Sequence, residues 1–223
     1  RGLRVEVDQA TYAELKRKLR EGEEVYGEVV VVEEKVEEVN PPPPFTTDTL
    51  LEEASARLGL TTTRVMEIAQ DLFELGFITY HRTDSTRVSE AGIAIAKAYL
   101  EEKYGDRYQE YLKPRSWGTG GAHEAIRPTR PIDPERLRLL IREGVIAVAQ
   151  PLTRQHFEVY RLIFNRFIAS QMKPAKVVKQ KLEARVNGSA KTVEHVVEVV
   201  DKGFLEVYPE YVDVEERVVS GKY

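Results

Sequence analysis

One tyrosine of the sequence has neighbours that could support nucleophilic chemistry. Tyr80 follows the apolar pair Phe77 and Ile78 and lies two residues before Arg82. An ordinary phenol is a weak nucleophile at neutral pH, but a nearby guanidinium can favour the phenolate and hold a phosphate oxygen through paired donors. Attack of such a tyrosine on a phosphodiester would give a phosphotyrosine, which conserves the energy of the broken bond. The alternative is a strand tyrosine beside an ordinary salt-bridging arginine.

A second group of candidate residues lies in a glycine-rich segment. His123 and Glu124 follow Gly120 and Gly121, and Arg127 comes four residues after the histidine. The imidazole could hold or transfer a proton near neutral pH, and together with the guanidinium it could contact one phosphate. The pattern is not His-Glu-x-x-His, so it does not indicate a zinc site. A solvated loop histidine is the alternative interpretation of His123.

The elements that would position Tyr80 are predicted to be helical. Two helices, over about 49–58 and 63–75, precede a strand over 77–80 that carries the tyrosine. Thr49 and Glu52 have the spacing of a capping box at the start of the first helix. A helix pair followed by a strand is typical of a winged-helix unit. Further helices are expected over about 89–104, 133–143 and 152–172, with a loop over 111–132.

Segments rich in β-branched residues flank this helical centre. Before it come a helix over about 8–20 and a strand from residue 26 to about 40, and a polyproline run, 41–44, then marks a boundary. After it, strands are expected over 177–186, 192–200 and 203–209. We therefore predict an α+β fold in which a helical, winged-helix-like domain (45–172) is inserted into an antiparallel β-rich arch or barrel domain (1–44 and 173–223).

The charge is unevenly distributed along the chain. The net charge is −4, yet residues 111–180 carry 13 cationic and 5 anionic side chains, a local excess of +8. Phosphate binding depends on where cations lie rather than on their total, so a nucleic-acid partner is compatible with the acidic sum. A solvated basic surface would explain the same excess.

The composition narrows the class of protein. A hydrophobic share of 42% and a charged share of 31% are those of a soluble globular protein. The absence of cysteine excludes disulfides and thiolate metal sites. No apolar run approaches the roughly 20 residues of a membrane span, and the first residues do not lead into a signal peptide, so we expect a cytoplasmic protein. Few asparagines and many charged residues suit a heat-adapted source.

The two candidate segments, taken together, resemble the signatures of type IA DNA topoisomerases. Residues 77–86 (FITYHRTDST) resemble that family's active-site tyrosine segment, and residues 122–129 (AHEAIRPT) resemble its second signature. Residues 44–50 (PFTTDTL) and 167–175 (FIASQMKPA) fit the family in the same order, so the resemblance covers about 41–209. The proline run, the His-Arg step after the tyrosine and residues 115–118 (RSWG) most resemble the topoisomerase half of reverse gyrases.

This resemblance implies roles for individual residues. Tyr80 would attack one DNA strand and become linked to its 5′ phosphate, Arg82 would position the tyrosine and the phosphate, and His123 would assist. Asp84 would orient Arg82 or the neighbouring backbone. The DNA- or phosphate-binding residues implied are Arg127, Glu124, Asp84, Arg87 and Arg115.

The sequence lacks other parts of that family's machinery. It contains no Asp-x-Asp-x-Glu pattern of a Toprim domain and no Gly-x-x-x-x-Gly-Lys-Ser/Thr motif for ATP. The resemblance implies that Mg²⁺ and ATP would be bound by a Toprim and a helicase-like domain of the whole protein, and no cofactor is expected in this chain. DNA, as a single-stranded segment at the site, and the Toprim domain are the expected partners of a monomeric chain that is inactive alone.

Two other function classes remain at this point. A noncatalytic winged-helix DNA-binding module would explain the helix pair and the basic region, but not the two signature segments. A tyrosine recombinase would place its nucleophile after the histidine and arginine residues, whereas Tyr80 precedes His123 and Arg127.

Overall fold

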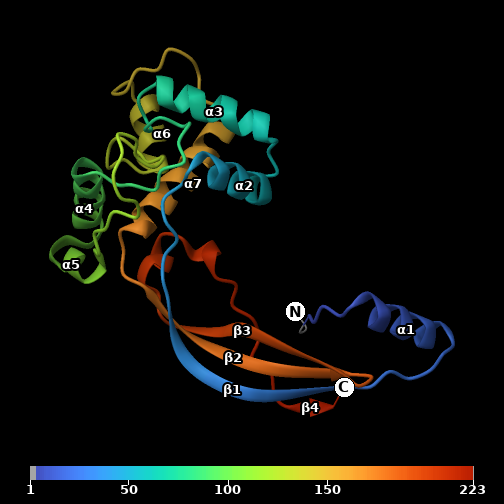
Figure 1. Ribbon diagram of the computed structural model, residues 1–223. Helices are drawn as coiled ribbons and strands as arrows, with labels where there is room; N and C mark the ends of the chain where they lie inside the picture. The colour runs from blue at the N-terminus through green and yellow to red at the C-terminus, as the bar shows by residue number, and fades with distance from the viewer. Residues whose placement is uncertain (1–3, 223) are drawn as a thin grey trace. The chain divides into compact units, whose positions relative to one another are not determined.

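The structure, a computed structural model, describes residues 4–222, which form two compact units (Figure 1). Unit 1 contains the described residues within 1–39, 175–202 and 210–223. Unit 2 contains residues 40–174 and 203–209. Unit 1 is built on an antiparallel sheet and unit 2 on helices, so the α+β class predicted from the sequence is confirmed.

The described residues of unit 1 form one α-helix and a four-stranded sheet. The sheet order is β3-β2-β1-β4, and every strand pair in it is antiparallel. Asn187 and Gly188, both with positive φ, join β2 to β3 in a two-residue turn of the kind that matches strand twist. The elements are α1 (Gln9–Arg20), β1 (Gly27–Val39), β2 (Ala175–Val186), β3 (Ser189–Asp201) and β4 (Gly221–Lys222).

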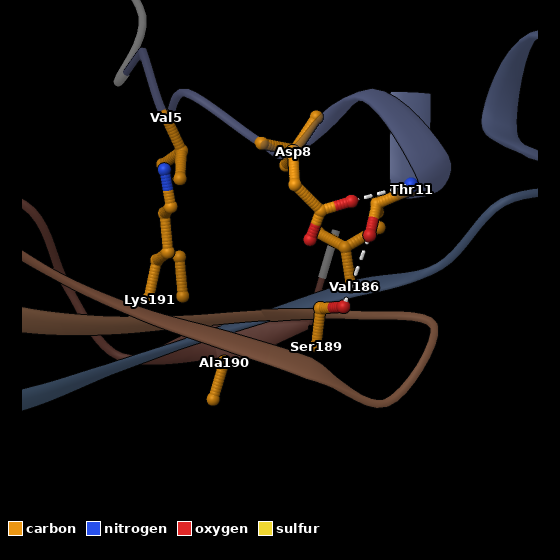
Figure 2. A pocket seen from close by; sticks show the side chains of 9 residues that line it. Val5, Asp8, Thr11, Val186, Ser189, Ala190 and Lys191 are labelled. Atoms are coloured by element: carbon orange, nitrogen blue, oxygen red, sulfur yellow. Dashed lines mark hydrogen bonds between the residues drawn. The ribbon is translucent and has the colours of Figure 1, made fainter. Parts of the chain in front are cut away.

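The start of α1 lies beside the β2–β3 turn, around a small pocket (Figure 2). Asp8 caps the helix by accepting a hydrogen bond from the Thr11 backbone N–H at 2.7 Å. The Thr11 and Ser189 hydroxyl groups are 3.2 Å apart. Val5 and Lys191 also line this pocket of about 180 Å³. The contacts are those of a helix docked on a hairpin within unit 1.

Unit 2 is organised around one long helix, α7. Twelve of its seventeen residues are buried, and α2, α3 and α6 contact it. Within the described chain no helix is long and apolar enough to cross a membrane. The helices are α2 (Thr47–Leu58), α3 (Thr62–Glu74), α4 (Glu90–Tyr104), α5 (Tyr108–Tyr111), α6 (Pro134–Arg142) and α7 (Arg154–Ser170), with 3-10 turns at Gly105–Arg107 and Gly203–Glu206. A further 3-10 turn, Pro209–Tyr211, lies where the chain passes from unit 2 to unit 1.

The polyproline run enters unit 2 against α7. Arg166 of α7 donates a hydrogen bond from Nε to the Pro43 carbonyl at 2.6 Å. Its guanidinium also lies 4.5 Å from the centre of the Phe45 ring, which is completely buried. Arg166 is itself only 6% exposed. Arg166, which belongs to the basic stretch 111–180, is therefore packed in the core of unit 2 rather than on its surface.

The first helix of unit 2 begins differently from the prediction. Thr46, not Thr49, is the N-cap of α2. The Thr46 hydroxyl accepts from the Thr49 backbone N–H at 3.3 Å, and the Thr49 hydroxyl accepts from the Thr46 N–H at 2.9 Å. The capping box is thus shifted by one turn, and Glu52 has no part in it. Threonine can fill both positions because its hydroxyl group donates and accepts.

Two predicted strands are also corrected. The segment Phe77–Tyr80 is not a strand, since its only ladder contact is an isolated bridge between Ile78 and Pro128. The Phe77 N–H bonds instead to the Leu72 carbonyl, and the Arg127 N–H bonds to the Thr79 hydroxyl, so these two donors do not extend the pairing. The segment 203–209, expected as a strand, instead begins with a 3-10 helix, and Gly203 turns the chain with φ of +50°.

Candidate functional site

Tyr80 lies at the surface of unit 2 against two aromatic rings. Its ring meets Phe73 edge-on at 5.2 Å and an interplanar angle of 67°, and it meets His81 at 5.2 Å and 65°. The Tyr80 side chain is nevertheless 45% exposed. Edge-to-face contacts restrain a ring without covering it. The phenol is therefore both held in place and accessible to a large substrate.

Thr79 fastens the chain just before Tyr80 to the segment that contains Arg127. The Thr79 backbone N–H donates to the Arg127 carbonyl at 2.9 Å. The Thr79 hydroxyl donates to the Ala125 carbonyl at 2.7 Å and accepts from the Arg127 N–H at 3.0 Å. The two signature segments are thus joined directly by one threonine.

Thr47, the first residue of α2, fastens the chain just after Tyr80. Its hydroxyl donates to the His81 carbonyl at 2.8 Å and accepts from the Thr83 N–H at 2.9 Å. Its own N–H donates to the Thr83 carbonyl at 2.9 Å. Three hydrogen bonds therefore hold the backbone on both sides of Arg82. Thr47 and Thr79 were not among the predicted site residues, because their partners are 34 to 48 residues away in sequence.

We predict that Thr47→Val loosens this segment. Valine keeps the shape but removes the hydroxyl group, which leaves the Thr83 N–H without its acceptor, at a cost of about 1–3 kcal/mol. Hydrogen exchange should become faster at the Thr83 amide and remain slow at the Thr79 amide, which bonds to Arg127.

The matched control for this variant is Thr192→Val, an exposed site on β3 of unit 1. It should leave the exchange rate of both amides unchanged. Equal protection of Thr83 in Thr47→Val and in the wild type would show that the hydroxyl does not hold the segment.

His81 forms an uncharged aromatic wall beside Tyr80. The side chain is 4% exposed, and within residues 4–222 neither ring nitrogen has a hydrogen-bond partner. Burial lowers the pKa of His81, and the positive charge of Arg82 lowers it further. The imidazole is therefore neutral at physiological pH, and Arg82 provides the positive charge of this segment.

Arg82 and Asp84 are both exposed, but they are not paired. Among residues 4–222 no hydrogen bond or ion pair joins the two side chains. The described residues therefore show no direct contact through which Asp84 would orient Arg82, and its role toward the neighbouring backbone stays a prediction. Arg82 instead lines a groove next to Met66 and Gln70 of α3.

Arg127 and Glu124 form a buried, bidentate ion pair. Arg127 donates from Nε to Glu124 Oε1 at 3.0 Å and from Nη2 to Oε2 at 2.7 Å. It also donates from Nη1 to the Pro128 carbonyl at 3.0 Å, and Glu124 accepts from the Ser89 N–H at 2.8 Å. The Arg127 side chain is 7% exposed. Its guanidinium faces the protein, so it positions this segment rather than meeting solvent.

Close packing against α4 encloses this pair. A Cβ atom at Gly92 of α4 would lie 2.8 Å from Arg127 Nε and 2.9 Å from a Val88 methyl group. Burial raises the pKa of Glu124, but the hydrogen bonds from Arg127 and Ser89 outweigh it and the net pKa is lowered. Glu124 is therefore ionised at neutral pH.

The remaining predicted residues are dispersed. His123 is exposed, and its carbonyl accepts from Arg87 Nε at 3.3 Å. In the described chain no hydrogen bond, ion pair or ring contact joins His123 to Tyr80 or Arg82. Arg115 donates from Nη2 to the Met172 carbonyl at 2.6 Å and stacks 4.9 Å from the centre of the Trp117 ring. Arg115 therefore ties the loop to the end of α7.

Comparison with known proteins gives consistent matches. Residues 5–221 match a family model described as DNA topoisomerase. The chain is 50% identical over 189 residues to reverse gyrase 2 of Sulfurisphaera tokodaii and 50% identical over 187 residues to the reverse gyrase of Pyrococcus furiosus, matches that cover 82% and 84% of it. It spans 15% of the length of each relative.

A solved structure of full-length topoisomerase I from Thermotoga maritima also resembles this one. The match covers 97% of this chain and 34% of that chain, with 31% sequence identity and a TM-score of 0.61.

Proposed function

The chain belongs to the DNA topoisomerase family, and we propose that it is the tyrosine-bearing part of a reverse-gyrase-like type IA enzyme that breaks and reseals one DNA strand. Its similarity to reverse gyrases and to a topoisomerase I supports this proposal. In the whole protein the strand passage would be coupled to ATP and would introduce positive supercoils.

The observation that carries the proposal is the setting of Tyr80. The phenol is exposed, while threonines on both sides bind its backbone to two other signature segments. In the proposed reaction the phenol oxygen attacks the phosphorus atom and loses its proton. The bond from phosphorus to the 3′ oxygen of the upstream nucleotide breaks, and the 5′ phosphate stays on Tyr80. The freed 3′ hydroxyl reverses these steps, so resealing needs no new energy source.

Arg82 has the chemistry to stabilise this transfer. It is exposed two residues from Tyr80, and a guanidinium can donate two parallel hydrogen bonds to phosphate oxygens as their charge rises. His123, which is also exposed, would assist through the phosphate and its neighbours. Arg127, Glu124 and Arg115 would act by holding the loops in place.

The metal of the proposed reaction does not fit this chain. The described residues contain no group of three or more histidine and carboxylate side chains that could hold a metal ion. We propose that Mg²⁺ and ATP are bound by Toprim and helicase-like domains elsewhere in a monomeric, cytoplasmic protein, and that this chain alone does not cleave DNA. We also propose that α2, the Gly59 turn and α3 form the helix pair of a winged-helix unit.

Trapping the covalent intermediate tests this function. The full-length protein is incubated with a single-stranded oligonucleotide labelled on the 3′ side of the cleavage position and then denatured. The label is expected on one peptide, with its 5′ phosphate on Tyr80. Label recovered from the upstream fragment, or on a peptide without Tyr80, would refute the assignment. A noncatalytic module would bind the oligonucleotide and yield no adduct.

A further inference from the structure

A groove that Arg82 lines is otherwise formed by residues with no part in the reaction proposed above. It is an open surface groove along α2 and α3 with a volume of about 380 Å³. Leu51 of α2 and Met66 of α3, both half-buried, give it apolar walls. Arg82 also lines it. The groove thus combines an apolar surface with the cation that follows the tyrosine.

Uncharged polar groups line the rest of the groove. Thr62 and Thr63 supply hydroxyl groups at the start of α3, and Gln70, whose Nε2 donates to Glu74 Oε1 at 3.0 Å, supplies its amide oxygen two turns later. Hydroxyl and amide groups can pair with the donor and acceptor atoms of a base edge. Glu67 is the one carboxylate in the lining, and it forms an ion pair with Arg64 at 3.3 Å. A flat, partly polar ligand with an adjoining phosphate suits this set of groups.

The groove and the tyrosine share one helix. Met66, Gln70 and Phe73 follow at helical spacing on α3, and Tyr80 packs on Phe73. Seven residues of helix separate Met66 from Phe73, which corresponds to about 10 Å along the axis. A nucleotide next to the one attacked by Tyr80 would therefore be within reach of the groove.

We propose that this groove binds a nucleobase of the downstream strand, the strand that remains attached to Tyr80 after cleavage. The inference rests on the proposed 5′ phosphotyrosine link. Met66 and Leu51 would contact the face of the base, Gln70 and the threonines its edge, and Arg82 the phosphate before it. Groove and tyrosine belong to unit 2, so the bound base moves with the covalent link. The groove would keep the attached strand aligned for resealing.

Abasic oligonucleotides test the proposal in the full-length protein. Single abasic sites are placed in turn at the first three positions on either side of the cleavage position, and adduct formation is measured. At one downstream position the loss of the base should reduce adduct formation about tenfold in the wild type. In the Met66→Ala/Gln70→Ala variant the same abasic site should change it less than twofold.

Two further variants make the result decisive. Gln70→Ala alone, at an exposed position, should show a partial loss of the base dependence without affecting folding. Glu101→Ala, exposed on α4, should keep the full tenfold dependence. An abasic penalty that is equal in the wild type and in the double variant, or that occurs only upstream, would overturn the groove assignment alone. No adduct with any unmodified oligonucleotide would overturn the strand-cleavage function as well.

Discussion

Replacing Tyr80 with phenylalanine is expected to reduce covalent adduct formation by the full-length protein by at least about 10³-fold. The substitution removes only the phenol oxygen, which is the proposed nucleophile. The phenylalanine ring can keep the edge-to-face contacts with Phe73 and His81. Affinity for single-stranded DNA should therefore stay within about twofold of the wild type. Denaturing gels of a labelled oligonucleotide measure the adduct, and fluorescence anisotropy measures the affinity.

A second tyrosine supplies the matched control for this experiment. Tyr12 of α1 is 58% exposed, and Tyr12→Phe removes a phenol oxygen from unit 1. It should leave adduct formation unchanged. If Tyr80→Phe formed adducts at the wild-type level, the chain would have to be reinterpreted as a noncatalytic DNA-binding part of its protein.

The helices of unit 2 could be predicted because their signals are local. Ser89 caps α4 and Asp133 caps α6, each by accepting a hydrogen bond from a backbone N–H three residues later. The apolar face of α7, expected over 152–172, is buried over Arg154–Ser170. Capping side chains and 3.6-residue periodicity involve neighbours in sequence, so the sequence alone contains them.

The supports of the candidate site were not predictable in the same way. Thr47 and Thr79 form hydrogen bonds to residues 34 to 48 positions away in the sequence. Nothing in the local sequence around either threonine indicates these partners. Whether Phe77–Tyr80 is a strand depends on which partners its backbone takes, and there the Phe77 N–H bonds to Leu72 while the Arg127 N–H bonds to the Thr79 hydroxyl. The sequence pattern identifies Tyr80 as the residue that could react, whereas the hydrogen bonds that hold its backbone segment depend on tertiary contacts.

The charge of a sequence segment likewise does not show which of its side chains are buried. The basic excess of residues 111–180 suggested a surface for phosphate. Arg127 and Arg166 are 5% and 6% exposed, and both bind groups within unit 2. The excess is therefore partly internal, whereas Arg82, which is exposed, lies outside the basic stretch and is the cation proposed to contact the DNA phosphate. Burial, which a sequence count does not contain, decides which arginines can meet a ligand.

The second large effect is expected from Arg127→Ala, which should lower the free energy of unfolding of unit 2 by about 3–5 kcal/mol. The substitution leaves the Glu124 carboxylate, 19% exposed, without its partner. Trp117, the only tryptophan of the chain, lies in unit 2 and reports its unfolding by urea through fluorescence. The matched control is Arg136→Ala, whose ion pair with Glu102 has the same 2.7 Å distance but is 49% and 61% exposed. That variant should lose only about 0–1 kcal/mol.

The pH dependence distinguishes a lost ion pair from a mere cavity. In the wild type the pKa of folded Glu124 lies below its ordinary value of 4.5, so the pair's contribution is complete above pH 4.5 and is lost as the pH falls through the folded pKa. In Arg127→Ala burial and the Ser89 hydrogen bonds remain but the largest opposing hydrogen bond is gone, so the pKa of Glu124 in the variant should lie above that in the wild type. Protonation then costs the variant less stability than it costs the wild type, and the stability gap should narrow between about pH 7 and about pH 4. A gap that stays constant over this range would attribute the loss to packing against Gly92 rather than to charge, and Arg127 would then hold the loop by its volume alone.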